Sequence, residues 1–567
     1  MCGITGLFGK GSSLDTIKAM MAISARRGPE HTQITGIENG WLGHALLAFV
    51  AEGANPQPYE YQGQLLTWNG EIYNWQVLNE RFDLQAENDT QVLLKGLVQM
   101  GDAFLHHIEG QFAYILISNE GSEPVISVGR DRWGISPLVY GVNEADQLGI
   151  ASTTESLSAN GFRNIKTVPA GCHGVFKNND IQLQYWFKLN LNKSGVNKAL
   201  CIEKVFEKAK RQVEIRIPDN SDILFTTMGG IDSQSVTVMT ALATKGKFGG
   251  AVTVVPWDPQ DPDNHTLGDY YEAKASIDML ASQGIKVPHY VAQLNPEYIL
   301  SEYQGRNALD RVLSVLGPDF FNVCCGLAED LVATIVRKNA GKAIMTAGGP
   351  DEAGWSYKPW SLRHKADLEY GFYAIGDQFA SSEGVRAGLV FGEQGIENRV
   401  PFAHLIEDAL QAPADQKHQI TDWGDGIDPM SIEMKDKIFW RQAVGRMLPD
   451  RSMNKPKETI HGATGAKAAI HHIAMNDKAY QSERHTFIEQ VMEFGWQGSI
   501  FADLNHLDVN NMLSEGQLYC LWRWQKVNIE EFSKSGNERY GNRFYSEQID
   551  VKASRPLCYD WMTVEPL

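Results

Sequence analysis

The sequence contains little cysteine, no long apolar run and fewer basic than acidic residues. Seven cysteines are scattered over 567 residues, an odd number that is not typical of a disulfide framework and favours a reducing, cytoplasmic location. No stretch of about 18 consecutive apolar residues occurs, so we expect no transmembrane helix. Neither a basic segment nor a long apolar segment follows Met1, so no signal peptide is predicted.

The charge balance disfavours two classes of partner. Lys and Arg number 51 against 69 Asp and Glu, which gives a net charge of −18. So acidic a surface repels phosphate backbones and anionic lipids, and we expect neither a nucleic-acid nor a membrane partner. The 43% of hydrophobic residues and 21% of charged residues are typical of globular proteins. A polyanionic ligand must therefore bind where positive charge is concentrated locally.

Residues 1–190 are predicted to consist mostly of strands. Short apolar or alternating runs predict strands at Ala45–Val50, Gln64–Trp68, Gln111–Ser118, Pro124–Val128 and Pro137–Gly141. Apolar spacings of three and four predict helices at Leu14–Arg26 and Asn88–Met100, enough to cover the faces of a stacked sheet. The polar residues 190–197 have linker composition and indicate a domain boundary.

Strands and helices alternate after the linker. The predicted elements are the helix Ala199–Ile215, the strand Asp222–Thr227, the helix Gln234–Thr244, the strand Ala251–Val255, the helix Tyr270–Ser282, and the strands Val287–Val291 and Ala343–Thr346. This alternation predicts a parallel sheet covered by helices on both faces. Residues 366–527 are predicted to be mainly helical. The chain thus divides into domains at 1–190 and 191–526 and an unassigned tail at 527–567.

Cys2 is a candidate nucleophile. Removal of Met1 would leave a thiol and a free α-amine on one residue, and an amine with a pKa of about 7.7–8.0 can take up the thiol proton. For Cys2 alone, a small buried residue at a chain end is an open alternative. Asn69 and Gly70 follow a predicted strand and offer a side-chain amide and a backbone N–H, the donors of an oxyanion hole. Asp89 places a carboxylate at a helix start, where a helix cap is the alternative.

Several segments in this region closely resemble the glutaminase domain of class II, N-terminal-nucleophile amidotransferases. They are residues 1–8, 27–30, 69–74, 88–94 and 129–138, in the family's order. The resemblance implies an αββα sandwich of the N-terminal-nucleophile type. It also implies that Cys2 attacks the side-chain amide of glutamine, that Asn69 and Gly70 hold the oxyanion, and that Asp89 binds the α-ammonium group.

One departure from that family affects glutamine binding. The family usually has an Arg two residues after the His of a Gly-His stretch, where this chain has Leu46. Leucine cannot form a charge-assisted bond to the α-carboxylate of glutamine. Either Arg26 or Arg27 takes this role, or glutamine binds weakly, or the amide donor is different.

A second motif lies between a predicted strand and a predicted helix. Glycine and the N–H groups of a helix N-terminus suit a phosphate, although a tight strand-to-helix turn is the alternative. Residues 228–233, Met-Gly-Gly-Ile-Asp-Ser, resemble the Ser-Gly-Gly-x-Asp-Ser loop of ATP pyrophosphatases. The resemblance implies that Gly229, Gly230, Asp232 and Ser233 bind ATP and its pyrophosphate, with Met228 in place of the leading Ser.

An acidic cluster and a basic cluster follow later in the chain. Asp351 and Glu352 lie at a predicted strand end, where adjacent carboxylates suit Mg²⁺ or proton transfer, with a solvated acidic turn as the alternative. Lys457 lies in the basic, glycine-containing residues 454–462, which taken alone are typical of an exposed loop.

With residues 397–402 and 437–449, these motifs make residues 198–526 similar to the synthetase domain of the asparagine synthetase B family. The resemblance implies that Asp232 and Asp351 organise Mg²⁺ and pyrophosphate, that Lys457 steadies charge on an acyl-adenylate, and that Glu352 assists proton removal from the attacking amine. The implied fold is an α/β parallel-sheet adenylating domain with a largely helical C-terminal part. A homodimer is also implied.

The sequence therefore predicts a glutamine-dependent, ATP-driven amidation of a carboxylate through an acyl-AMP intermediate. The cofactors are ATP and Mg²⁺, and the partners are glutamine, ATP and a small-molecule carboxylate, by default aspartate or else a specialised acceptor. Two alternatives stay open: an intramolecular amide-forming ligase of the β-lactam synthetase or lasso-cyclase type, and a non-catalytic binding subunit that retains the fold.

Overall fold

The computed structural model describes residues 1–49, 57–120, 123–177, 180–188, 199–354, 356, 384–410, 412–420, 434–454, 464–493 and 514–527. The chain divides into two compact units. The N-terminal unit comprises Met1–Lys188 and Glu383–Asn398, and the C-terminal unit comprises Leu189–Ser382 and Arg399–Leu567. The sequence pattern does not indicate that residues 383–398 belong with the first unit.

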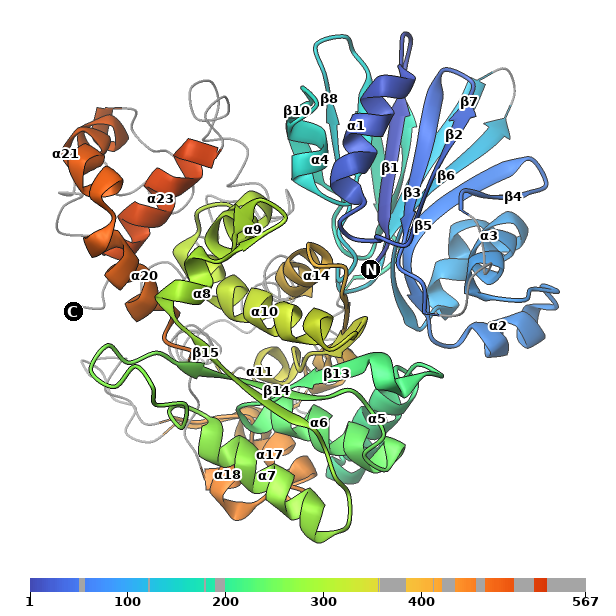
Figure 1. Ribbon diagram of the computed structural model, residues 1–567. Helices are drawn as coiled ribbons and strands as arrows, with labels where there is room; N and C mark the ends of the chain where they lie inside the picture. Colours follow the sequence, from blue (N-terminus) through green and yellow to red (C-terminus); the bar gives the residue numbers. More distant parts are fainter. Residues whose placement is uncertain are drawn as a thin grey trace. The chain divides into compact units, whose positions relative to one another are not determined.

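The N-terminal unit contains two six-stranded antiparallel sheets (Figure 1). The first sheet has the order β10 (Arg163–Thr167), β8 (Val139–Val142), β9 (Leu148–Ala151), β1 (Gly3–Phe8), β3 (Gly40–Leu46), β2 (His31–Ile37). The second has the order β12 (Asp180–Tyr185), β11 (Cys172–Lys177), β7 (Glu123–Arg130), β6 (Gly110–Glu120), β5 (Gln64–Ile72), β4 (Tyr59–Tyr61).

Helices cover both sheets of this unit. Helices α1 (Leu14–Ser24) and α4 (Thr154–Ser158) contact the first sheet, and α3 (Asp89–Met100), with α2 (Trp75–Phe82) beside it, contacts the second. The core between the sheets joins Ile4 and Leu42 of one sheet to Ile115 and Val128 of the other. Every residue of β1 is buried, because the strand is covered on both faces. The predicted αββα sandwich is confirmed.

One predicted strand is wrong. The apolar run Ala45–Val50 suggested a strand, but β3 ends at Leu46, and the described residues that follow, 47–49, are not in a strand. The reason is local: the N–H of Leu47 donates to the sulfur of Cys2 (3.5 Å) instead of to a neighbouring strand. A backbone N–H that donates to a side chain is not available for a hydrogen bond to a neighbouring strand, so the strand ends there.

A third sheet belongs to the C-terminal unit except for Glu397 and Asn398 of its last strand. Its order is β15 (His289–Leu294), β14 (Gly250–Pro256), β13 (Leu224–Thr227), β18 (Ala343–Met345), β19 (Glu397–Arg399). The first four strands are parallel. Helices α6 (Ile231–Thr244) and α7 (Tyr270–Ser282) lie on one side of this sheet and α10 (Phe320–Lys338) on the other (Figure 1). The predicted parallel sheet with two covered faces is confirmed.

The remaining described elements are mainly helices. They are α5 (Ile202–Glu214), α8 (Pro296–Leu300), α9 (Ala308–Leu316), α11 (Pro350–Ala353), α14 (Gly384–Gly392), α15 (Leu405–Leu410), α16 (Ala414–Lys417), α17 (Ile438–Val444), α18 (Asp450–Asn454), α20 (Ala466–Asn476), α21 (Lys478–Glu493) and α23 (Glu515–Val527). Those after residue 366 agree with the mainly helical region predicted at 366–527. Among the described helices, none is both long enough and apolar enough to cross a bilayer. The tail after residue 527 lies outside the described residues.

Gly70 on β5 occupies a position that only glycine tolerates. Its φ is +153°, and a Cβ there would lie 2.1 Å from the carbonyl oxygen of Gln111 on β6. We expect Gly70→Ala to lower the free energy of unfolding by about 2–4 kcal/mol in urea denaturation. Gly63→Ala is the matched control, since Gly63 has φ +75° but nothing within 4 Å of a Cβ, and it is expected to cost about 1 kcal/mol. Equal losses in the two variants would contradict the steric explanation.

Candidate functional sites

Cys2 lies immediately before β1 and is partly buried. Its sulfur accepts a hydrogen bond from the N–H of Leu47 (3.5 Å). Burial raises the pKa of the thiol to about 11, although the nearby N-terminal amine and the Leu47 bond lower it. Because the thiol is protonated at neutral pH, a reaction at Cys2 requires a base that removes its proton.

The α-amine at the chain terminus has properties that suit this role. Burial lowers the pKa of the Met1 α-amine to about 6, against the charge of Glu397, which raises it. An amine with this pKa is largely neutral at pH 7 and can accept a proton. Met1 itself is fully buried, and its sulfur lies 3.7 Å from a guanidinium nitrogen of Arg27. If Met1 is removed, the α-amine belongs to Cys2 itself.

The side-chain amide of Asn69 is the next candidate group. Asn69 lies on β5, a strand that contacts β1. Its side chain is fully buried, and neither its oxygen nor its nitrogen has a hydrogen-bond partner among the described residues. A buried amide without partners is costly in a native protein and indicates a place for a ligand. An oxyanion is such a ligand, since it accepts a hydrogen bond from the amide nitrogen.

Asp89 is the first residue of α3, but it does not cap the helix. The side chain of Asn88 does so, accepting from the N–H of Gln91 (3.0 Å). One carboxylate oxygen of Asp89 instead accepts from the N–H of Ile72 at the end of β5 (3.4 Å). Asp89 therefore lies beside the strand that carries Asn69, where an anionic group can bind an ammonium ion.

Both arginines near Cys2 already have partners. The Arg27 guanidinium is fully buried and donates to the carbonyl of Cys2 (3.3 Å) and that of Gly388 on α14 (3.2 Å). Burial lowers the pKa of Arg27 to about 10, opposed by the charge of Glu393. Arg26 binds Glu393 and Glu155, each at 2.9 Å. Holding a substrate carboxylate would require either arginine to exchange these bonds.

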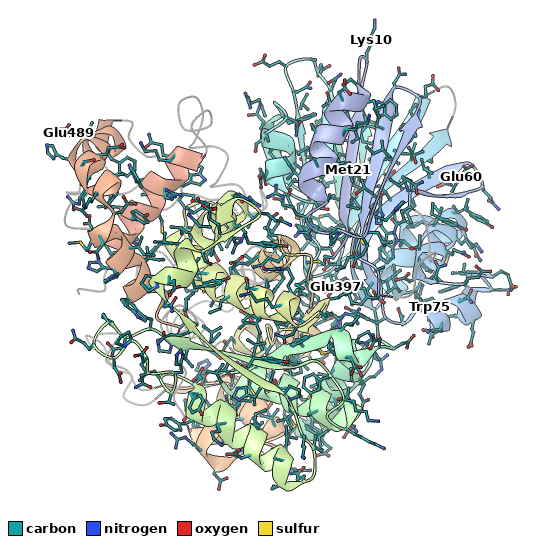
Figure 2. The ribbon with its side chains drawn as sticks, viewed as in Figure 1. Lys10, Met21, Glu60, Trp75, Glu397 and Glu489 are labelled. Atoms are coloured by element: carbon teal, nitrogen blue, oxygen red, sulfur yellow. The ribbon has the colours of Figure 1, made fainter. Side chains whose placement is uncertain are left out.

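Sequence reasoning missed Glu397 at this site. Glu397 (Figure 2) is buried, and its charge raises the pKa of the Met1 amine, of Cys2 and of Asp89. It reaches the N-terminal unit through residues 383–398, almost 400 positions along the chain. No local pattern could have shown this, because only folding brings the segment to Cys2.

The raised pKa of Asp89 predicts that the free energy of unfolding depends on pH. Burial raises its pKa to about 6, with a further contribution from Glu397, whereas an unfolded Asp has a pKa of about 3.9. Between these values the folded chain binds more protons than the unfolded chain, so stability rises as the pH falls from about 6 to about 4. Above about pH 6 the charged carboxylate destabilises the fold. We therefore expect Asp89→Asn to raise the free energy of unfolding at neutral pH by about 1–3 kcal/mol and to flatten this pH dependence.

Urea denaturation across this pH range measures the effect. Asp15→Asn is the matched control, because Asp15 also lies in the first turn of a helix but is exposed. This control should lose at most about 0.5 kcal/mol, the worth of a favourable helix-dipole contact. A loss of stability in Asp89→Asn at neutral pH would show that the carboxylate is stabilising and would overturn this expectation.

The glycine loop in the C-terminal unit joins β13 to α6. Gly230 is the N-cap of α6, a helix of 14 residues, and Ser233 donates from its hydroxyl to the Gly230 carbonyl (3.1 Å). The side chain of Met228 packs with Ala251 and Ala273 in the core. The loop backbone thus presents N–H groups at a helix N-terminus, an arrangement that favours an anion.

Lys437 forms the centre of a charged cluster beside this loop, and sequence reasoning did not single it out. Its ammonium group lies 2.6 Å from Asp232, 2.8 Å from Asp351 and 3.7 Å from Asp436. Burial lowers the pKa of Lys437, but the three carboxylates outweigh burial and hold the pKa above its usual range. Lys437 has φ +51°, and a non-glycine residue in this conformation is often found at functional sites.

The carboxylates fit a Mg²⁺ ion that is bound together with phosphate. One oxygen of Asp232 is buried and has no hydrogen-bond partner among the described residues. No cluster of three or more metal-ligating side chains occurs in the described part of the chain. Mg²⁺ commonly takes one or two carboxylates and completes its shell with waters and substrate phosphates. Asp232 and Asp351 suit this mode and not an all-protein metal cage.

Of the two other predicted site residues, the structure describes Glu352 but not Lys457. Glu352 is buried on α11, and one carboxylate oxygen accepts from the N–H of Gly349 (3.1 Å), so it caps that short helix. Lys457 lies outside the described residues. The structure therefore brings Asp232 and Asp351 together around Lys437, while Glu352 follows Asp351 in the chain.

The N-terminal sandwich corresponds to a known domain family. Residues 1–187 match a family described as "Glutamine amidotransferase domain". Asparagine synthetase B (glutamine-hydrolyzing) of Escherichia coli is 25% identical over 476 residues, 78% of this chain and 83% of the relative. Human asparagine synthetase (glutamine-hydrolyzing) is 25% identical over 445 residues, 71% of this chain and 75% of the relative. Over most of its length the chain is therefore similar to glutamine-hydrolyzing asparagine synthetases, at about 25% identity.

Solved structures add little to this assignment. A glutamine phosphoribosylpyrophosphate amidotransferase from B. subtilis, complexed with ADP and GMP, matches with a TM-score of 0.30 and 14% identity. The match covers 62% of this chain and 82% of that one. With so low a score, the fold rests on the sheet order and not on this likeness.

Proposed function

We propose that this chain is a carbon–nitrogen ligase that takes nitrogen from glutamine and uses ATP to amidate a carboxylate through an acyl-AMP. One observation carries the proposal: a single chain combines a match to a glutamine amidotransferase domain with a phosphate-type glycine loop. Its relatives over 71% and 78% of the chain are glutamine-hydrolyzing asparagine synthetases. The proposed division is a glutaminase domain at 1–190, an adenylating domain at 191–526 and a tail at 527–567. Aspartate is the first acceptor to test, and a homodimer stays a prediction.

In the N-terminal unit, Cys2 attacks the side-chain amide of glutamine, and its thiol proton passes to the α-amine. A thioester forms, ammonia leaves with that proton, and water then releases glutamate and restores the thiol. Asn69 and the N–H of Gly70 donate to the oxyanion, and Asp89 holds the substrate ammonium. Support comes from the Asn69 amide, which has no hydrogen-bond partner among the described residues, and from the raised pKa of Cys2, which makes a base necessary.

In the C-terminal unit, the acceptor carboxylate attacks the α-phosphorus of ATP and pyrophosphate leaves. Ammonia then attacks the acyl carbon and AMP leaves. Gly229, Gly230 and Ser233 hold the pyrophosphate, and Asp232 and Asp351 hold Mg²⁺, which neutralises phosphate charge when it is bound. Lys457 steadies charge on the adenylate, and Glu352 accepts a proton from the attacking amine. Support comes from one oxygen of Asp232, which lies in the first turn of α6 and has no hydrogen-bond partner in the described part of the chain.

The test uses amide-¹⁵N glutamine, Mg-ATP and a panel of carboxylic acids that begins with aspartate. Mass spectrometry follows AMP and labelled product. We expect one acid to form a ¹⁵N amide together with AMP. AMP formation that does not respond to glutamine or to ammonia would instead favour an intramolecular ligase, and binding of both substrates without turnover would favour a non-catalytic subunit.

A further inference from the structure

Gln234 lies in the first turn of α6, directly after the glycine loop, and its side chain is buried. Its amide nitrogen donates to the carbonyl of Gly229 (2.6 Å). Its amide oxygen accepts from the hydroxyls of Ser276 (2.7 Å) and Ser452 (2.6 Å). The orientation of this amide is determined by the network, because a backbone carbonyl can only accept and therefore faces the nitrogen.

The three partners of Gln234 come from different parts of the C-terminal unit. Gly229 is in the glycine loop, Ser276 is on α7 and Ser452 is on α18. Helix α18 is also held to α7 by Arg451, which lies 2.9 Å from Glu272. The chain continues from α18 into residues 455–463, which contain Lys457. One buried amide thus joins the loop proposed for pyrophosphate to the helix that precedes the proposed charge-stabilising lysine.

The bond to Gly229 also determines the direction of a neighbouring donor. In a trans peptide the C=O and the next N–H lie in one plane and point in opposite directions. Because the Gly229 carbonyl faces the buried Gln234, the N–H of Gly230 points away from it, and Gly230 is exposed. Without this bond, a Gly-Gly peptide has wide conformational freedom and could rotate.

We propose that Gln234 is a positioning residue for the nucleotide site: it keeps the Gly230 N–H turned outward for a phosphate oxygen, and through Ser452 it holds α18 in place against the loop. This proposal rests on the proposed use of ATP. Gln234 acts through the loop and through α18, because its buried amide is bonded to Gly229 and Ser452.

Three variants separate the bonds of the Gln234 amide. Gln234→Ala removes all three bonds, to Gly229, Ser276 and Ser452, whereas Ser452→Ala removes only the bond to α18. Ser276→Ala is the matched control, because it deletes the same kind of hydroxyl from the same amide oxygen but on α7. Titration gives the Kd for Mg-ATP, AMP formation at saturating ATP gives the rate, and thermal denaturation gives Tm.

We expect Gln234→Ala to weaken Mg-ATP binding about tenfold, since the loop loses its one bond to the amide. Ser452→Ala should lower the rate of AMP formation about fivefold, with the Kd for Mg-ATP within about twofold of the parent. Ser276→Ala should change neither, although its Tm falls as much as that of Ser452→Ala. Equal rates in the two serine variants, or an unchanged Kd in Gln234→Ala, would overturn the proposal.

Hydrogen exchange on the ligand-free protein tests the same network without nucleotide. Gln234→Ala should exchange faster than the parent at residues 228–234 and 450–454, whereas Ser452→Ala should do so at 450–454 alone. If the parent protein binds no Mg-ATP, the proposed function fails, and the exchange result still decides the structural role of Gln234. Unchanged exchange at both segments in Gln234→Ala would show that the amide holds neither.

Discussion

Replacement of Cys2 by Ala is expected to lower the release of ammonia from glutamine by at least about 10³-fold, because the variant has no sulfur nucleophile. Amide formation from added ammonia should persist, since the glycine loop and the Asp232–Lys437–Asp351 cluster belong to the C-terminal unit. Glutamate release and ¹⁵N incorporation, each measured with glutamine and with ammonium chloride, check the two halves of this expectation.

Cys201→Ala is the matched control, because Cys201 is a free cysteine that is exposed in the C-terminal unit. It should retain both activities. Glutaminase activity in Cys2→Ala equal to that of the parent would rule out Cys2 as the nucleophile. An intact mass adds a separate check: active protein that retains Met1 would contradict a base formed by the α-amine of Cys2.

Replacement of Lys437 by Met is expected to lower the free energy of unfolding by about 3–5 kcal/mol. The variant leaves Asp232, Asp351 and Asp436 close together without the ammonium group that lies among them. Methionine is similar in length to lysine, so lost packing contributes little. Urea denaturation of parent and variant, analysed with a common slope, measures the loss.

Two further variants make this result specific. Lys435→Met removes an exposed lysine two positions away and should change stability by no more than about 0.5 kcal/mol. Adding Asp232→Asn to Lys437→Met should restore part of the loss, because it removes one of the uncompensated charges. A Lys437→Met variant as stable as Lys435→Met would show that the carboxylates do not depend on this ammonium group.

The element pattern of this protein follows from local sequence. The helices at α1, α3 and α7 and the strands at β13, β14 and β18 lie where apolar spacing predicted them, because each buries one face or both. The strand predicted at 45–50 was wrong. Its residues have the apolar pattern of a strand, but the N–H of Leu47 donates to the sulfur of Cys2. The spacing of apolar residues predicts which residues are buried. It does not predict which backbone N–H groups donate to side chains.

Some site residues could be predicted from local sequence and others could not. The motifs around Cys2, Asn69, Asp89 and Asp232 stand out because their chemistry depends on residues close together in sequence. Glu397 and Lys437 could not be found in this way, since their partners are hundreds of positions distant. Nor could the sequence show that the guanidinium of Arg27, a candidate for binding glutamine, holds the carbonyl of Cys2.

By itself, the sequence determined the two kinds of sheet, the candidate nucleophile and the candidate phosphate loop, because propensity, periodicity and short motifs act over a few residues. Only the tertiary structure decided which charges meet. It placed Lys437 between Asp232 and Asp351, brought Glu397 to the chain terminus and joined Gly229 to α18 through Gln234. Electrostatic and hydrogen-bond energies depend on distance in space, and the distance between residues that are remote in sequence is set only by folding.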